Sequence, residues 1–514
     1  MPLARRLHLD DVVTSFPELG PTVPDGGYSW VVLFGVFLVQ MTIPSVLSMY
    51  GVVLGYMGEN EAAEFDIWNE KLILTPILFT AFWNLADPWT RMIVSMATIP
   101  RLVGVIGVAL LSVGIIASGY LATGGVGAYL ASSSAGAVMG IGASFVVTLS
   151  DHVLRKYFRK KLLLALTLRN VGASFGLVLI PAITNLLLHE AKLKAGLLLM
   201  TIVLLPTAVG TLTFRLPPSS EHASPYSLLL STEEDNELPV RISSDAPQSS
   251  QRQNNRDDLP DLEYSETEDR IHGGGLFSEG SNIYAYQEPE GDVELFVNPV
   301  VHSNGKWHQQ LRVLKTIRFW AAVIGWSGMK ASTLFFWISL PALSLTIKDV
   351  TYFYGWMAIT IAAGVGTFLP NLASYKVLKA TSQSRRLYFG IASWLCGFTL
   401  IGLTYATNYS WIMIGALSGG ICIGSLLSCQ DLALYDVLGA EAVRCIYKGF
   451  STLVGLCILV FCFIHSMNFC LRLAASLQFF GGFYWILTPT LNIIKATRYR
   501  PSHTMTERAE TRHN

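Results

Sequence analysis

Two basic side chains lie inside long apolar stretches of this sequence, where a charge calls for an explanation. Lys330 stands in the segment GWSGMKASTLFFW, and Arg169 is followed by Asn170 in the segment TLRNVGASFG. A charged side chain in the middle of a membrane costs about 2.5–3.5 kcal/mol even on the mildest scale. Both cations can form charge-assisted hydrogen bonds with a carboxylate. Arginine binds it in a bidentate way, and lysine acts as a point charge. We therefore interpret Lys330, Arg169 and Asn170, with the nearby Trp326, as candidate anion-binding residues.

Each cation also has a structural interpretation. Arg169 stands about 10 Å from the end of its predicted helix, so it can reach the membrane interface or pair with an internal acid. Lys330 stands about 16 Å into its predicted helix, which makes reaching the interface harder, but it too can pair with an acid. The aromatic residues around Lys330 either line a cavity or face lipid and core; they are Trp326, Phe335, Phe336 and Trp337.

An acid and a base share one helix face elsewhere in the chain. Asn84, Asp87 and Arg91 are three and four residues apart, which places them on the same side of a predicted helix. They predict either a gate whose ion pair forms and breaks, or a pair that neutralises itself near the membrane interface. Asp431, at the predicted end of a later helix, is either a proton carrier or a solvated side chain.

No pattern in the sequence is typical of an enzyme, a redox centre or a nucleic-acid-binding protein. The seven cysteines lie between Cys396 and Cys470, include no CxxC pair and mostly fall inside apolar runs. Such cysteines usually behave as small buried hydrophobic residues. We also find no nucleophile–base constellation and no phosphate-binding loop. We therefore predict no enzymatic activity, cofactor, metal ion or nucleic-acid partner.

The composition places these residues in a membrane protein with many spans. Of the 514 residues, 51% are hydrophobic and 14% are charged, whereas soluble domains average about 25% charged residues. Apolar runs long enough to cross a bilayer as a helix recur along the chain. We expect an all-α integral membrane protein with twelve transmembrane helices in two six-helix halves. The predicted spans lie within 24–56, 72–94, 102–122, 126–149, 162–188, 195–216, 319–340, 352–372, 387–407, 411–430, 446–464 and 471–494.

The polar segments complete this organisation. We expect an N-terminal tail, a first six-helix bundle, an acidic disordered loop, a second six-helix bundle and a C-terminal tail, over residues 1–28, 29–216, 217–316, 317–494 and 495–514. If the N-terminus is cytoplasmic, twenty lysines and arginines fall in the short inner segments and the C-terminal tail, and five fall in the outer loops. Because short cytoplasmic loops carry an excess of positive charge, this bias predicts that both termini and the acidic loop are cytoplasmic.

Three short motifs stand at the ends of predicted spans. The first span begins with Asp25, Gly26, Gly27, Tyr28, Ser29 and Trp30. The fifth is preceded and opened by Tyr157, Phe158, Lys160, Lys161, Leu164, Ala165, Gly172 and Gly176. The tenth is followed by the segment LALYDVLG. With the six-plus-six layout, these motifs resemble those of the monocarboxylate transporter family of the major facilitator superfamily.

The resemblance implies two bundles around a central cavity that binds a solute and opens alternately to each side. It further implies a secondary transporter of a small, monocarboxylate-like organic anion in the plasma membrane. Some members of that family work with a single-span accessory membrane glycoprotein. Two departures from the family disfavour a plain proton–lactate symporter. Ser48 stands where the proton-coupled carriers have a lysine, and the span 352–372 lacks their aspartate and arginine.

Three functions therefore stay open. The first is a carrier of a small organic anion, with facilitated, sodium-linked and proton-linked movement not separated. The second is a pH-independent facilitator of a larger zwitterionic or aromatic metabolite. The third is a non-transporting receptor or regulator on a carrier scaffold, with the acidic loop as its working part.

Overall fold

The computed structural model describes residues 26–60, 73–121, 127–158, 161–216, 314–345, 352–464 and 466–498. The predictions for Asp25, most of the N-terminal tail, the acidic loop and the end of the C-terminal tail lie outside the described residues. The described residues belong to one compact unit, formed by Thr22–Pro218 and Val293–Asn514. They form helices and the short turns between them.

The first half consists of helices that follow one another with short connections. The first predicted span is divided in two, because Pro44 lies in the turn at 43–45 and a proline has no backbone N–H to continue the helical ladder. The elements are α2 (Tyr28–Thr42), α3 (Val46–Asn60), α4 (Leu74–Met96), α5 (Pro100–Leu121), α6 (Gly127–Tyr157), α7 (Leu162–Leu199), the 3-10 helix η2 (Met200–Leu204) and α8 (Leu205–Leu212).

The second half repeats this pattern. Its elements are α12 (Ile317–Leu345), α13 (Tyr352–Leu372), α14 (Ser374–Leu378), α15 (Ser382–Thr404), α16 (Tyr409–Leu438), α17 (Ala440–Leu459), the 3-10 helix η4 (Val460–Phe463) and α18 (Met467–Arg498). Thr381 caps the start of α15, where its side chain accepts a hydrogen bond from the Ser384 amide.

Eight segments of the described chain are long and apolar enough to cross a membrane by length and composition. Helices α4 and α12, with 23 and 29 residues, are also long enough to span the hydrocarbon core. These observations agree with the predicted all-α membrane fold.

Several helices extend beyond the predicted spans. The segment between the predicted spans 126–149 and 162–188 is helical as far as Tyr157, so Asp151 lies inside α6. Helix α16 runs on to Leu438, so the prediction that Asp431 ends its helix is wrong. Hydropathy locates the apolar core of a span, but leucine, lysine and arginine also favour helix and carry it further. The ends of the helices therefore follow propensity and packing.

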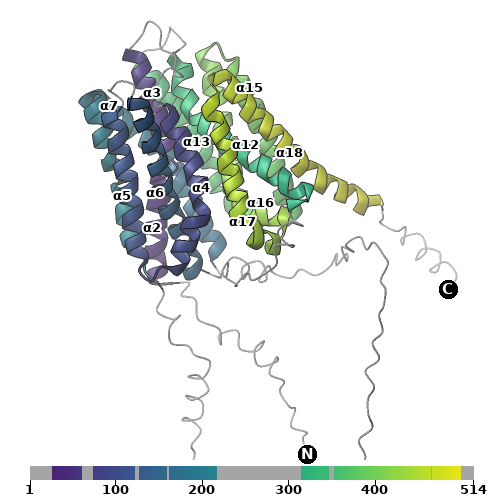
Figure 1. Ribbon diagram of the computed structural model, residues 1–514. Helices are drawn as coiled ribbons and strands as arrows, with labels where there is room; N and C mark the ends of the chain where they lie inside the picture. Colours follow the sequence, from purple (N-terminus) through teal and green to yellow (C-terminus); the bar gives the residue numbers. More distant parts are fainter. Residues whose placement is uncertain are drawn as a thin grey trace, which may run out of the picture. The chain divides into compact units, whose positions relative to one another are not determined.

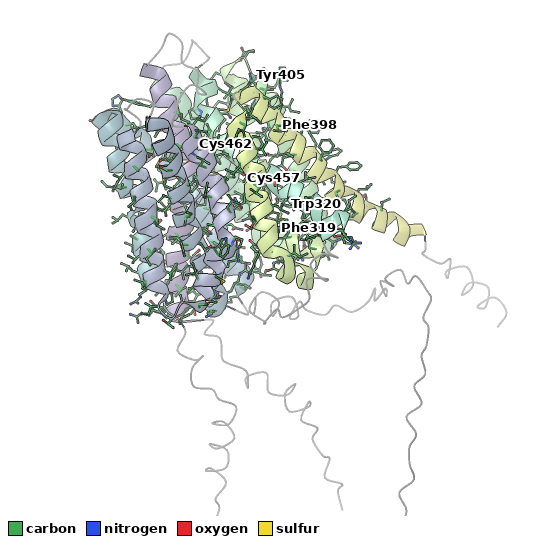
Figure 2. The ribbon with its side chains drawn as sticks, viewed as in Figure 1. Phe319, Trp320, Phe398, Tyr405, Cys457 and Cys462 are labelled. Carbon is green, nitrogen blue, oxygen red and sulfur yellow. The ribbon has the colours of Figure 1, made fainter. Side chains whose placement is uncertain are left out.

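The two halves meet along a few pairs of helices (Figure 1). Helix α6 packs against α4 and α5 in the first half, and α16 packs against α13 and α15 in the second. Across the halves, α4 lies against α17, α7 against α13, and α3 against α12. Figure 2 labels aromatic side chains on the outside of the second half, where Phe398 of α15 is 60% exposed. Trp320 and Tyr405 are also exposed, near the ends of their helices, as expected for a surface that faces lipid.

Candidate functional site

A cavity of about 150 Å³ is lined by residues of both halves. Helices α2, α3, α4, α6 and α7 contribute from the first half, and α12, α13, α16 and α17 contribute from the second. Among the described residues, none from α5, α8, α15 or α18 lines this cavity. The charged residues of its wall are Asp87, Arg91, Asp151, Arg169 and Lys330. Because both halves form the wall, any movement of one half against the other changes the cavity.

Lys330 reaches the cavity from the middle of α12. Its ammonium nitrogen lies 5.6 Å from the centroid of the Trp83 ring on α4, a distance at which the ring face attracts a cation. Trp326 and Trp337 extend the aromatic wall from the same helix as Lys330, and Trp326 stacks on Phe389 with ring centroids 6.3 Å apart. This part of the cavity combines a positive charge with apolar surfaces.

Arg169 also lies in the cavity wall, but it is 95% buried, with a relative exposure of 5%. Its guanidinium donates a hydrogen bond to the Asp151 carboxylate on α6 at 2.9 Å. It also donates to the side-chain oxygen of Asn170 at 3.2 and 3.3 Å. Asn170 in turn donates to the carbonyl of Ser428 on α16 at 3.3 Å. Arg169 therefore has an acidic partner, and its neighbour connects it to the opposite half.

Asp151 is a site residue that the sequence reasoning missed, because it lies outside the predicted spans. Ser144, Thr148 and Asp151 follow one another at spacings of four and three residues, which places three polar side chains on one face of a helix. That periodicity could have indicated that α6 continues past its predicted end. Thr148 and Asp151 both line the cavity.

Asp87 and Arg91 form an ion pair within α4. The Nε atom of Arg91 lies 3.0 Å from the Asp87 carboxylate, and Thr148 on α6 donates to the same carboxylate at 3.2 Å. The contact between the halves is made by the Nη2 atom of Arg91, which donates to the Tyr447 hydroxyl on α17 at 2.9 Å. Tyr447, which the sequence reasoning also missed, is therefore the residue through which this group connects the halves.

Three other residues named from the sequence have different outcomes. Asp431 lies in α16, but its side chain lies outside the described part of the structure, so its role stays a prediction. Phe335 and Phe336 are fully buried between helices and do not line the cavity. The Phe335 ring instead lies 4.9 Å from the ring of Phe461. Of the four aromatic residues around Lys330, the two tryptophans line the cavity and the two phenylalanines do not.

Comparison with known proteins agrees with this architecture. A family model described as Major Facilitator Superfamily matches residues 88–461, which is more than half of the chain. The chain belongs to the major facilitator superfamily. It is also similar to a human (Homo sapiens) protein, monocarboxylate transporter 6, with 27% identity over 172 residues. This match covers 32% of the chain and 31% of the relative, so the chain matches about a third of that relative's length.

Proteins of the major facilitator superfamily are typically transporters of small-molecule solutes. A transporter built from two related helical halves binds its solute near the middle of the membrane, where the halves meet. The cavity lined by Lys330 and Arg169 lies where the two halves meet in the described structure. It is therefore the candidate solute site.

The first two motifs that resemble the monocarboxylate transporter family lie against each other. Gly27 precedes α2 with φ of 58°, a backbone conformation that glycine adopts easily. The Trp30 ring meets the Phe158 ring at 5.9 Å, and the Lys161 ammonium lies 5.7 Å from the Trp30 ring. These contacts join the start of α2 to the connection between α6 and α7. None of the described motif residues lines the cavity: Gly26, Gly27, Trp30, Tyr157, Phe158, Lys161 and Gly172.

Replacing Asp151 with asparagine is expected to destabilise the protein and to make its stability depend on anions. The substitution removes the carboxylate that faces the buried Arg169, and breaking a buried ion pair typically costs about 3–5 kcal/mol. A soluble carboxylate that binds in place of Asp151 would stabilise the folded state by mass action. We expect a lower thermal unfolding midpoint, and a larger increase with lactate or pyruvate than the wild-type protein shows.

The Asp436→Asn variant is a matched control for this experiment. Asp436 pairs with Arg385 at 2.8 Å, and neither residue lines the cavity. This variant should also lose stability, but it should gain no additional response to lactate or pyruvate. If Asp151→Asn and the wild-type protein respond equally to these anions, Arg169 is not an anion contact.

Proposed function

We propose that this chain is a secondary transporter that moves a small organic anion of the monocarboxylate type by alternating access. The observation that supports this proposal most directly is the position of two cations. Arg169 on α7 and Lys330 on α12 come from opposite halves of the molecule and line the same cavity. An anion held between them contacts both halves at once, so its binding can favour the arrangement in which the halves close around it.

Each proposed binding residue has a distinct role. Lys330 provides a point charge for the carboxylate, and Arg169 provides two donors in a fixed geometry. Asn170 orients the Arg169 side chain through its own oxygen atom. Trp326, with Trp83, offers flat apolar surfaces to the rest of the solute. Because Arg169 already contacts an acid, the arriving carboxylate must share or replace that contact, which links solute binding to the state of the ion pair.

The described cavity favours an anion over the zwitterion considered above. An ammonium group would need an acceptor, and both described acids of the wall already face arginines: Asp87 faces Arg91 and Asp151 faces Arg169. A carboxylate would meet two cationic donors, the Lys330 ammonium and the Arg169 guanidinium, and Arg169 would share its contact with Asp151. The tryptophan rings of the wall suit an aromatic or branched body on the anion.

The gate in this proposal is the contact between Arg91 and Tyr447. The Arg91 guanidinium forms an ion pair with Asp87 of the same helix, and it donates a hydrogen bond to the Tyr447 hydroxyl of the other half. Separation of α4 from α17 would break the second contact and leave the first intact. Asp431 is the proposed proton carrier if transport is proton-linked, and Asp431→Asn should then remove the stimulation of uptake by acid.

The cellular setting is also part of the proposal. The distribution of lysine and arginine supports cytoplasmic termini. The resemblance to the monocarboxylate transporter family supports the plasma membrane. Epitope tags at either terminus should be accessible to antibody only after the cells are permeabilised. A single-span accessory glycoprotein, if one is needed, should co-purify with the tagged chain and increase its amount at the cell surface.

The experiment that tests the proposed function is uptake of labelled solutes at acidic and at neutral external pH. The panel contains lactate, pyruvate, butyrate, an aromatic amino acid and creatine. We expect saturable uptake of at least one of the carboxylates. Greater uptake at acidic pH would indicate proton symport, and equal uptake at both pH values would indicate a facilitator. Uptake of creatine or the amino acid alone would contradict an anion carrier, and no uptake despite surface expression would contradict the proposal.

A further inference from the structure

Three proline residues interrupt the hydrogen-bond ladders of helices at the interface between the halves. They are Pro88 in α4, Pro181 in α7 and Pro341 in α12. A proline inside a helix cannot donate to the carbonyl four residues before it. The carbonyls released in this way belong to Asn84, Leu177 and Trp337, and all three of these residues line the cavity.

Each released carbonyl meets a residue of the opposite half. Ser451 on α17 donates its hydroxyl hydrogen to the Asn84 carbonyl at 2.9 Å. Gly364 on α13 lies so close to α7 that an added Cβ would be 3.0 Å from the Leu177 carbonyl oxygen. Gly51 on α3 is the residue against the Trp337 carbonyl, and an added Cβ would overlap with that oxygen. The same arrangement thus occurs at α4–α17, α7–α13 and α3–α12 (Figure 1).

The two other prolines inside described helices differ from these three. Pro370 in α13 lies against Gly424 of α16, which belongs to the same half. Pro489 lies in α18, which does not line the cavity. Five prolines lie inside described helices. In three of them, the released carbonyl meets the opposite half and belongs to a residue that lines the cavity.

We propose that these three carbonyls are the points at which the halves separate and rejoin, and that Ser451, Gly51 and Gly364 are the positioning residues that receive them. This inference rests on the proposed alternating access. A carbonyl without a partner is costly in lipid or in dry protein, but it is tolerated where it lines a water-filled cavity. When the halves separate, water can replace the serine or glycine. Opening then exchanges one partner for another and breaks no regular helical bond.

Gly51 and Gly364 lie where two helices of opposite halves come too close together for a side chain. A glycine Cα–H can contact a carbonyl oxygen directly, a weak interaction that recurs where helices meet closely. A methyl group at Gly51 would overlap with the Trp337 carbonyl oxygen. A methyl group at Gly364 would lie 2.7 Å from the Val178 Cγ2 atom and 3.0 Å from the Leu177 carbonyl oxygen. Gly55, one turn after Gly51, extends the contact, since an added Cβ would lie 2.8 Å from the Pro341 ring.

The test is hydrogen–deuterium exchange of the full-length purified chain, read by mass spectrometry. We expect Gly51→Ala combined with Gly364→Ala to hold the halves apart, and to increase exchange about tenfold in segments 46–56, 174–184, 334–344 and 357–368. Exchange in α5 and α15 should not change. Because no solute is used, a positive result would stand even if the uptake panel disproved anion transport.

Gly136→Ala is the matched control. Its added Cβ would lie 2.5 Å from the Thr75 carbonyl oxygen, which is also a close backbone contact but lies within the first half. This variant should leave exchange at the four cross-half segments unchanged. Unchanged exchange in the folded double-glycine variant, or an equal increase in Gly136→Ala, would overturn the proposal.

A second test adds no atoms at the interface and remains usable if the glycine variants do not fold. Ser451→Ala removes the donor to the Asn84 carbonyl and should increase exchange around α4 and α17. Pro88→Ala restores the backbone N–H that lets the carbonyl return to the helical ladder. In the Pro88→Ala background, Ser451→Ala should therefore have no further effect. An equal effect of Ser451→Ala in both backgrounds would overturn the proposal at this position.

Discussion

Replacing Lys330 with alanine is expected to reduce carboxylate uptake by about 10- to 100-fold at low solute concentration. A hydrogen bond to a charged group contributes about 1.5–3 kcal/mol, and each 1.4 kcal/mol or so is a factor of about ten in binding. Lys330 lines the cavity from the second half, while Arg169 lines it from the first. The effect should appear as a higher solute concentration at half-maximal uptake, measured in cells with equal amounts of protein at the surface.

Two further variants make this measurement specific. Lys448 lies in α17 next to Tyr447, but it is exposed and does not line the cavity. Lys448→Ala removes the same charge without changing the solute site, so uptake should stay near the wild-type value. Lys330→Arg keeps the charge and should retain part of the uptake. Normal uptake by Lys330→Ala would remove Lys330 from the site, and equal loss in Lys448→Ala would show that the effect is not local.

The two cations of the site could be recognised from the sequence. Lys330 and Arg169 each interrupt an apolar run, and the cost of a charge in such a run does not depend on tertiary detail. The expectation that they share one cavity came from the family resemblance, because more than a hundred residues separate α7 from α12 in the chain. Their role in binding an anion stays a prediction.

The partners of these residues could not be read from hydropathy. Asp151 appears to belong to a loop until the continued polar face of α6 is taken into account. Tyr447 is one aromatic residue among many, and its contact with Arg91 depends on how α4 lies against α17. Pairings between helices depend on their relative position and rotation, which a single hydrophobic pattern does not contain.

The class of fold was predictable, whereas the ends of the helices were not. Long apolar runs predict membrane helices because the bilayer excludes other exposed backbone structures. The same runs give little information where a helix continues into polar residues, as α16 does as far as Leu438. The break between α2 and α3 at Pro44 is a case where one residue overrides an apolar run.

Replacing Arg385 with alanine is expected to destabilise the second half by about 3–5 kcal/mol, the usual cost of breaking a buried ion pair. The Arg385 guanidinium donates to both carboxylate oxygens of Asp436, each at 2.8 Å. It also donates to the carbonyls of Leu378 at 3.1 Å and Ala380 at 2.7 Å. One buried side chain therefore joins the end of α14 and the start of α15 to α16. Alanine would leave the Asp436 carboxylate without these donors, which should appear as a clearly lower thermal unfolding midpoint of the purified protein.

Two other variants distinguish the structural role of the Arg385–Asp436 pair from a role in the solute site. Arg91 has 41% of its side chain exposed, and Asp87 keeps the hydrogen bond from Thr148 without it, so Arg91→Ala should cost less stability than Arg385→Ala. Replacing Arg385 and Asp436 together with leucine should restore part of the stability, because no buried charge is left behind. A double variant less stable than Arg385→Ala, or an Arg385→Ala midpoint equal to that of the wild-type protein, would contradict a structural role for the pair. Because neither residue lines the cavity, the Arg385→Ala protein that reaches the surface should keep its half-saturating solute concentration, whereas Lys330→Ala should keep its stability and lose uptake.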